Sequence, residues 1–249
     1  MLAIFQKEIT SFFSSLIGYI SITVYLVVTG LFLFILHSVF FGLDFNFFDY
    51  GYASMDNFFV LSPYVFLFLI PAVTMRLFSE EKKAGTLEII STRPITEIQI
   101  ILGKYFAALL LVIIAILPTL LYYYSIYHLA LPAGNVDVGA IRGSYIGLIF
   151  LSAVFVSIGL FASALTDNQI VAFILAAFFC FVFYLAFNAL SGLGLLGGKA
   201  DDIIQQVGIQ YHYASLSRGV VDSRDVIYFL SLIIVFLLST KVALESRKW

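Results

Sequence analysis

Six long apolar stretches constrain the fold of this chain more than any other feature. A helix needs about 20 mostly apolar residues to cross roughly 30 Å of hydrocarbon, and each stretch is about that long. Charged residues make up only 11% of the chain, whereas about 25% is usual in soluble domains. The sequence therefore predicts an all-α, polytopic membrane protein with spans at about 17–41, 58–77, 102–124, 144–165, 170–190 and 226–244. The first stretch is too long for a signal-peptide core and precedes no Ala-x-Ala site, so we expect it to be retained.

Lysine and arginine residues near the span ends predict the orientation of the chain. With six spans, both termini and the loops after spans two and four share one side of the membrane, and positive residues favour the cytoplasm. On that side lie Lys7, Arg76, Lys82, Lys83, Arg93, Lys104, Lys241, Arg247 and Lys248. The other side has Arg142, Lys199, Arg218 and Arg224. We therefore expect both termini and the loop after span two to be cytoplasmic.

Residues 1–16 have the pattern of an amphipathic helix. The apolar residues that recur at spacings of three and four are Leu2, Phe5, Ile9, Phe12 and Leu16. Polar residues, among them Lys7 and Glu8, fall mostly on the opposite face and would be costly at bilayer depth. The pattern favours a helix that lies in the membrane interface before span one, and the alternative is that this segment extends the first span.

The densest charged segment, residues 80–88, follows span two. Glu80 and Glu81 fall where the first turn of a short helix is expected, and Gly85 interrupts the pattern. Leu87 and Ile90 then form an apolar stripe that ends before the Arg93-Pro94 pair. Such a surface helix is suited to docking into a groove on a soluble protein. The alternative is a solvated loop whose lysines contact anionic lipid.

Two prolines distinguish span two. Pro63 and Pro71 each remove one backbone donor, and membrane helices tolerate this where a neighbour or a water-lined path satisfies the freed carbonyl. Span two is therefore either a pathway-lining helix or a helix with an ordinary packing kink. In span five, Tyr184 and Asn188 are among the few polar groups and are the corresponding pathway candidates.

Span four contains pairs of small residues that are four positions apart. The pairs are Gly143 with Gly147, Ala153 with Ser157, and Gly159 with Ser163. Small residues let helix backbones approach closely. The spacing therefore predicts that span four is central to the bundle.

Motifs for catalysis are missing from the sequence. A P-loop would need Gly-Lys-Ser or Gly-Lys-Thr, but Tyr105 follows Gly103-Lys104 and Ala200 follows Gly198-Lys199. There is also no zinc-binding H-E-x-x-H motif, and a net charge of −2 argues against nucleic acid as a partner. We therefore predict no catalytic, cofactor-binding or metal-binding residue on this chain, and we expect any catalysis to belong to a partner.

Taken together, these features resemble the ABC-2 type permeases, the membrane subunits of ATP-binding-cassette exporters. The resemblance rests on the six spans, the N-terminal amphipathic helix, the E-E-x-x-x-G-T-L-E run of residues 80–88 and the Arg93-Pro94-Ile95 sequence that follows. Two further stretches, residues 71–78 and 216–225, are similar to one branch of the family, the permease associated with gliding motility in Bacteroidetes.

The resemblance implies a half-transporter in the bacterial cytoplasmic membrane. It pairs with a second permease, alike or different, and with a separate cytoplasmic ATPase that holds ATP and Mg. In the family, the segment after span two is a coupling helix that docks on the ATPase, and spans two and five line the interface and the route. The docking residues implied are Glu80, Glu81, Lys82, Gly85, Thr86, Leu87, Glu88 and Ile90. The glutamates would pair with basic groups, and Leu87 and Ile90 would enter the ATPase groove.

Two other functions stay open. The same parts could transmit the ATPase cycle to an external protein without moving cargo, and a sizeable external segment from Gly192 to Asp225 would favour this. The chain could also be a membrane scaffold without energy coupling. If cargo is transported, the scarcity of polar residues in span five fits a lipid-linked or amphipathic cargo better than a sugar or an ion.

Overall fold

The computed structural model describes residues 1–35, 39–40, 43–44, 47, 54–87, 95–130, 132, 134–192 and 199–246. In these ranges the chain is almost entirely helical, and its two strands, β1 (Val39–Phe40) and β2 (Leu43–Asp44), pair antiparallel. Within the described ranges, six helices are long and apolar enough to cross a membrane: Leu16–Phe34, Asp56–Lys83, Glu97–Leu129, Val138–Leu165, Gln169–Gly192 and Ser223–Glu245. This confirms the predicted all-α polytopic membrane fold.

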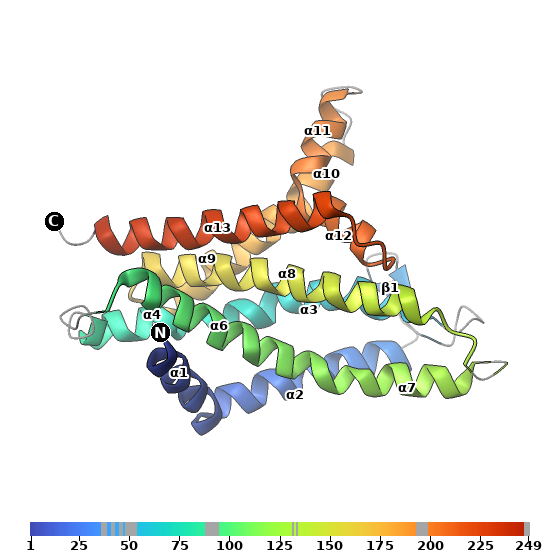
Figure 1. The fold of residues 1–249 in the computed structure, drawn as a ribbon, viewed down its shortest axis with the longest axis horizontal. Helices are drawn as coiled ribbons and strands as arrows, with labels where there is room; N and C mark the ends of the chain where they lie inside the picture. Colours follow the sequence, from blue (N-terminus) through green and yellow to red (C-terminus); the bar gives the residue numbers. More distant parts are fainter. Residues whose placement is uncertain are drawn as a thin grey trace.

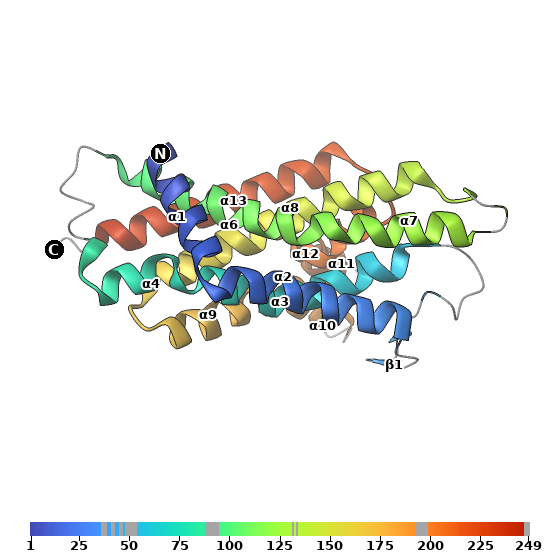
Figure 2. The ribbon, with the colours of Figure 1, turned by 90° about the horizontal axis from the view of Figure 1, so that it is seen from below.

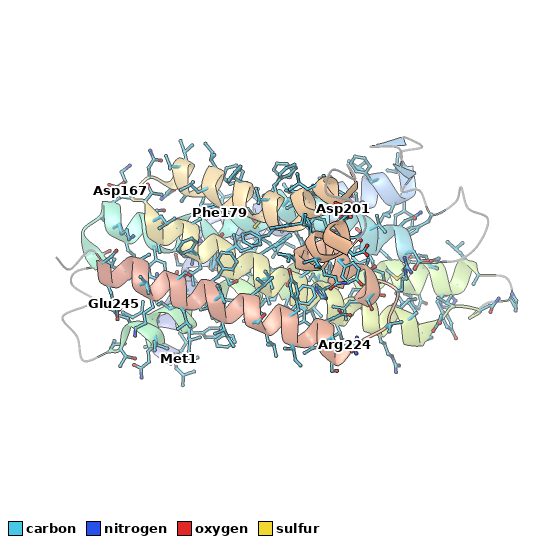
Figure 3. The ribbon with its side chains drawn as sticks, turned by 90° about the horizontal axis from the view of Figure 1, so that it is seen from above. Met1, Asp167, Phe179, Asp201, Arg224 and Glu245 are labelled. Atoms are coloured by element: carbon cyan, nitrogen blue, oxygen red, sulfur yellow. The ribbon has the colours of Figure 1, made fainter. Side chains whose placement is uncertain are left out.

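The six spans are built from shorter helical elements. In chain order these are α2 (Leu16–Gly30) with the π-helix η1 (Leu31–Ile35), α3 (Asp56–Thr74) with α4 (Arg76–Lys83), α6 (Glu97–Ile116) with the 3₁₀ turn η2 (Leu117–Thr119) and α7 (Leu120–Leu129), α8 (Val138–Leu165), α9 (Gln169–Phe181) with the π-helix η3 (Val182–Ala186) and α10 (Phe187–Gly192), and α13 (Ser223–Glu245). Apart from α10, these elements run side by side along the long axis of the molecule (Figure 1). The start of α1 (Leu2–Ser14) and the end of α13 lie at one end of this bundle, which we call the terminal end (Figures 1 and 2).

The helix α8 lies at the centre of the bundle. In the most apolar part of each span, 78% of α8 is buried inside the protein, against 22% for the span that begins with α9 and 22% for α13. The glycines of α8 permit the close packing: a Cβ on Gly159 would lie 2.0 Å from Thr74 Oγ1 of α3, and one on Gly147 would lie 2.5 Å from the Cβ of Leu216. The prediction from small-residue spacing is therefore confirmed. Apolar side chains on the outer helices, such as Ile174 and Phe178, are exposed as expected for contact with lipid.

The N-terminal helix α1 (Leu2–Ser14) is separate from α2. Ser15 between them is extended, with φ −104° and ψ 151°, and α1 lies across the terminal end of the bundle against α6 (Figures 1 and 2). Gly18 makes the turn possible, because a Cβ there would lie 2.6 Å from the carbonyl oxygen of Phe12. The position of α1 in a membrane interface stays a prediction.

Two further helices, α11 (Lys199–Val207) and α12 (Ile209–Leu216), connect spans five and six. They lie within the segment from Gly192 to Asp225 that the sequence places between these two spans. The α10 and α11 helices project sideways from the bundle, whereas α12 lies along α8 and α13 (Figure 1). Gly219, with φ +82°, lies so close to α8 that a Cβ on Gly143 would meet its carbonyl oxygen at 2.3 Å.

Spans two, three and four are longer than the sequence predicts. The sequence places the end of span two at residue 77, but α4 continues the helix through the charged residues to Lys83. Hydropathy ends a span at the first charged cluster, yet a helix can continue where those charges have partners inside the protein. Glu81 and Lys82 of α4 have such partners, and Glu81 is part of the candidate site.

Candidate functional site

Four charged side chains meet at the terminal end of the bundle. Lys104 Nζ of α6 lies 2.8 Å from Glu8 Oε1 of α1 and 3.0 Å from Glu81 Oε1 of α4. Lys7 Nζ lies 2.5 Å from the same Glu81 oxygen and 3.6 Å from Glu8 Oε1. We call Lys7, Glu8, Glu81 and Lys104 the charged cluster. Its two ammonium groups and two carboxylates balance, and it connects three helices.

Lys104 is the buried centre of the charged cluster. Its side chain is 1% exposed, and it also donates a hydrogen bond of 2.6 Å to the carbonyl oxygen of Leu77. The ammonium group lies 5.2 Å from the centre of the Phe78 ring. A buried charge is tolerated where it is paired and its donors are satisfied. Lys104 therefore fixes the first half of α6 to both α1 and α4.

Glu8 lies on the packing face of α1. The sequence places it mostly with the polar, outward face, and this prediction is wrong: Glu8 and Phe12 are the buried residues of α1. Lys104 supplies the partner that makes burial of the carboxylate possible. One turn further along, the guanidinium of Arg76 lies 4.6 Å from the centre of the Phe12 ring, which adds a second contact between α1 and α4.

A small pocket of about 270 Å³ opens beside the charged cluster. It is lined by Ala3, Ile4, Lys7, Glu81, Ile95, Ile100 and Lys104. The surface inside it is mostly apolar, because the cluster turns its polar atoms toward one another. Among the described residues, no group of three or more His, Cys, Asp or Glu side chains is placed to hold a metal ion.

The segment from Glu80 to Leu87 begins directly beside the charged cluster. Glu80 and Glu81 lie in the second half of α4, so the prediction that they occupy the first turn of a short helix is wrong. The helix ends at Lys83, and Gly85 follows with φ +67°, a conformation that glycine adopts without strain. Thr86 and Leu87 are helical again. The predicted docking residues Glu88 and Ile90 lie outside the described residues.

The side chains of this segment divide between the surface and the interior. Glu80, Lys83, Gly85 and Thr86 are exposed, and the Thr86 hydroxyl donates to the carbonyl oxygen of Glu81. Glu81 is only 8% exposed and is held inside the protein by the charged cluster. Lys82 contacts a different helix, because its ammonium group donates a hydrogen bond to the carbonyl oxygen of Ala164 at the end of α8. Leu87 is half-buried against the core.

A helix break at Met75 separates α3 from α4, and α8 stabilises it. The hydroxyl of Ser163 accepts hydrogen bonds from the backbone N–H groups of Phe78 (3.0 Å) and Ser79 (3.2 Å). The same hydroxyl donates to the carbonyl oxygen of Met75 at 2.9 Å. One side chain thus bonds to the N-cap carbonyl of α4 and to two N–H groups near its start, including Phe78 N–H in the first turn, where a helix leaves donors without helical partners.

The four pathway candidates lie elsewhere in the bundle. Pro63 and Pro71 are buried inside α3, which stays helical through both. Tyr184 is buried on η3, with its ring edge-on to Tyr64 of α3 at 6.2 Å between ring centres. Asn188 accepts a hydrogen bond of 3.2 Å from Gln205 of α11. The structure brings Tyr184 close to span two but places none of the four near the charged cluster, and the pathway role stays a prediction.

A comparison with protein families identifies the family of this chain. Residues 2–244 match the model of the ABC-2 family transporter protein, nearly the whole chain. The chain belongs to the ABC-2 transporter family. No curated protein matches it. Membrane proteins of the ABC-2 family are not themselves catalytic and normally work with an ATPase subunit.

In this ABC-2 family protein, sequence reasoning missed three of the residues that build the site. It treated Lys104 only as a positive residue near a span end, Glu8 as a polar residue of an amphipathic helix, and Ser163 as a small residue. A lysine that falls inside a predicted apolar span is a usable signal, because such a charge needs a partner. The sequence offers no way to choose which carboxylate that partner is.

Proposed function

We propose that the chain is a permease subunit of an ABC-2 type exporter in the bacterial cytoplasmic membrane. In this proposal the terminal end faces the cytoplasm, and the chain pairs with a second permease and with a separate ATPase that binds ATP and Mg. The observation that carries the proposal is the charged cluster. It fixes the base of the exposed segment after span two to the N-terminal helix and to span three. A force applied to that segment would therefore reach three helices at once.

The docking surface that we propose begins at the exposed end of α4. Glu80 and Lys83 would form ion pairs with the ATPase, and Gly85 and Thr86 would make the turn that presents the following residues. Lys82 and Leu87 would support this turn from the protein side, where both are partly buried. Glu88 and Ile90 keep their predicted docking role. Glu81 would hold the segment from inside, since its carboxylate already contacts two lysines.

To couple ATP binding to transport, the membrane helices must be able to adopt two arrangements, and ATP binding must favour one of them over the other. We propose that the break at Met75 lets α4 move relative to α3 while Ser163 keeps its backbone groups satisfied. The charged cluster would then carry α1 and the first half of α6 along with α4. Spans two and five would form the interface and the route, with Pro63, Pro71, Tyr184 and Asn188 as pathway residues.

The test is ATP hydrolysis by the chain purified in lipid nanodiscs with its ATPase. We expect Glu80→Lys to lower ATPase retention at least fivefold, because it reverses a charge on the docking surface. The matched control is Glu245→Lys, which makes the same change at an exposed carboxylate at the terminal end of α13. Equal retention in both variants would overturn the docking surface, and failure of any ATPase to bind would favour the scaffold function.

The gliding-motility branch is a further part of the proposal. It is supported by the similarity of residues 71–78 and 216–225 to that branch. Cells of a gliding bacterium that lack this chain should lose surface movement and regain it with the native gene. Recovery with a Glu80→Lys gene would show that movement does not depend on the proposed docking.

A second function, transmission of motion to an external protein, is favoured by one observation. The α10 and α11 helices project sideways from the bundle, and Ile203 of α11 is 63% exposed. In this alternative, Ile203→Asp would leave ATP hydrolysis unchanged and abolish the effect on the external protein. In the exporter function, the same variant would leave cargo movement intact.

A further inference from the structure

His212 joins three helices at the side of the bundle away from the charged cluster. Its Nδ1 lies 2.7 Å from Asp225 Oδ1 at the start of α13, and its Nε2 lies 2.9 Å from the carbonyl oxygen of Gln206 on α11. The imidazole ring stacks on Tyr228, with 3.8 Å between ring centres and 22° between planes. The side chains of His212 and Asp225 are only 15% and 10% exposed.

These contacts fix the number of protons that the pair must hold. A neutral imidazole has one N–H, and a carbonyl oxygen can only accept. If Nε2 donates to Gln206, Nδ1 of a neutral ring presents a lone pair to Asp225. An ionised Asp225 also presents a lone pair, and two lone pairs repel at 2.7 Å. Both hydrogen bonds therefore form together only when the pair holds one proton beyond neutral histidine and ionised aspartate.

Apart from Asp225, the groups that contact His212 among the described residues are an uncharged carbonyl and two tyrosines. From α13 it faces Asp225 and Tyr228, and from α11 it faces the uncharged carbonyl of Gln206. On its own helix, Tyr211 lies edge-on at 5.3 Å between ring centres. Tyrosine is uncharged over the range in which histidine usually titrates, about pH 5–8.

The charged residues next to Asp225 in sequence point elsewhere. Asp222 caps α13 by accepting from the backbone N–H of Arg224, and both residues are exposed. Neither provides a buried charge that could replace the shared proton.

We propose that His212 and Asp225 form a protonation-sensitive latch between α11, α12 and α13. With the extra proton bound, at low pH, the latch holds α11 and α12 against the start of α13. As pH rises and the proton leaves, His212 loses one of its two hydrogen bonds, and α11 is released. This inference does not depend on the proposed transport function.

Release would be confined to α11, because α12 has other anchors. The Tyr213 hydroxyl donates to the carbonyl oxygen of Phe59 at 2.8 Å, and the Ser144 hydroxyl donates to that of Ser217 at 2.8 Å. By contrast, α11 is held near α13 by His212 and by the Tyr228 hydroxyl, which donates to the carbonyl oxygen of Val207 at 2.6 Å. We therefore expect α11 to move when the latch opens and α12 to stay in place.

The experiment measures the distance between two spin labels by pulsed electron resonance in nanodiscs, where both faces see the same pH. Cys180, the single cysteine, is replaced by alanine, and Ile203→Cys with Ile227→Cys reports on α11 against α13. Both side chains are exposed, at 63% and 66%. We expect one narrow distance distribution at pH 5.5 and one at least twice as broad at pH 8.5. The control pair Arg218→Cys with Ile227→Cys should stay narrow at both values.

Two variants make the test specific. The amide of Asp225→Asn can donate to the neutral ring, so its distribution should be narrow at both pH values. His212→Phe keeps a ring to stack on Tyr228 but cannot form the hydrogen bonds, so its distribution should be broad at both. The latch would be overturned if the native distance distribution had the same width at both pH values, or if the Asp225→Asn distribution still broadened at high pH. It would also be overturned if the control pair broadened as much as the pair on α11 and α13.

Discussion

The ammonium nitrogen of Lys104 lies 2.8 Å from Oε1 of Glu8, although 96 positions separate the two residues in sequence. The pair forms only when α1 folds back onto α6, and Glu81 of α4 completes it at 3.0 Å. Three helices that are separate in the chain thus share one buried ammonium group. This contact determines where α1 lies and how the end of α4 is held.

Removal of the buried ammonium should strongly destabilise the protein. Lys104→Met leaves the carboxylate of Glu8 buried without its nearest cation, and we expect a loss of roughly 3–5 kcal/mol in the free energy of unfolding. Thermal unfolding in detergent micelles measures the effect. Adding Glu8→Gln should recover part of the loss, because it removes the unpaired charge.

The control for this prediction is Lys241→Met. Lys241 forms an exposed ion pair of 3.4 Å with Glu245 one turn away on α13, and such pairs contribute less than about 1 kcal/mol. A loss at Lys104 no larger than at Lys241 would show that the charged cluster does not stabilise the fold.

Gly159 should tolerate no side chain. A Cβ there would lie 2.0 Å from Thr74 Oγ1 and 2.8 Å from Thr74 Cβ, so Gly159→Ala must push α8 and α3 apart. Overpacking of this kind costs about 1–3 kcal/mol. Gly192→Ala is the matched control, since nothing lies within 4 Å of a Cβ at that position. Equal unfolding temperatures for the two variants would contradict the close packing of α8 on α3.

Gly85 should accept asparagine more readily than alanine. Its φ of +67° lies in the left-handed region, where alanine is strained by roughly 1–2 kcal/mol and asparagine is tolerated. A Cβ at Gly85 meets nothing within 4 Å, so the backbone alone determines the effect. ATPase retention in nanodiscs should follow the order Gly, Asn, Ala. The same retention in Gly85→Ala as in Gly85→Asn would show that this turn is not needed for docking.

The six spans and the central position of span four could be predicted because both depend on local pattern. Runs of apolar residues define the spans, and the spacing of Gly143, Gly147 and Gly159 defines a face for close packing. The charged cluster could not be predicted in the same way. Glu8 and Glu81 are both carboxylates near charged neighbours, and only the fold brings them to Lys104.

The helix boundary after span two shows the same limit. The sequence ends the span where charges begin and starts a new helix at Glu80. In the structure α4 continues to Lys83, because Glu81 binds Lys7 and Lys104 and Lys82 binds the end of α8. Long-range partners, rather than local propensity, determine where this helix ends.

The pairing of Lys7 predicts a loss of stability at alkaline pH. Burial alone lowers the pKa of Lys7, but the hydrogen bond and charge of Glu81, with the charge of Glu8, outweigh it and raise the pKa above its ordinary value of 10.5. A raised pKa in the folded state means that the stabilisation is complete below pH 10.5 and is lost as pH rises through the folded value. We therefore expect the unfolding temperature to fall at higher pH partly through Lys7. Lys7→Arg should fall less steeply, because arginine keeps its charge there, and identical alkaline slopes for the two proteins would show that the Lys7–Glu81 contact does not stabilise the folded state.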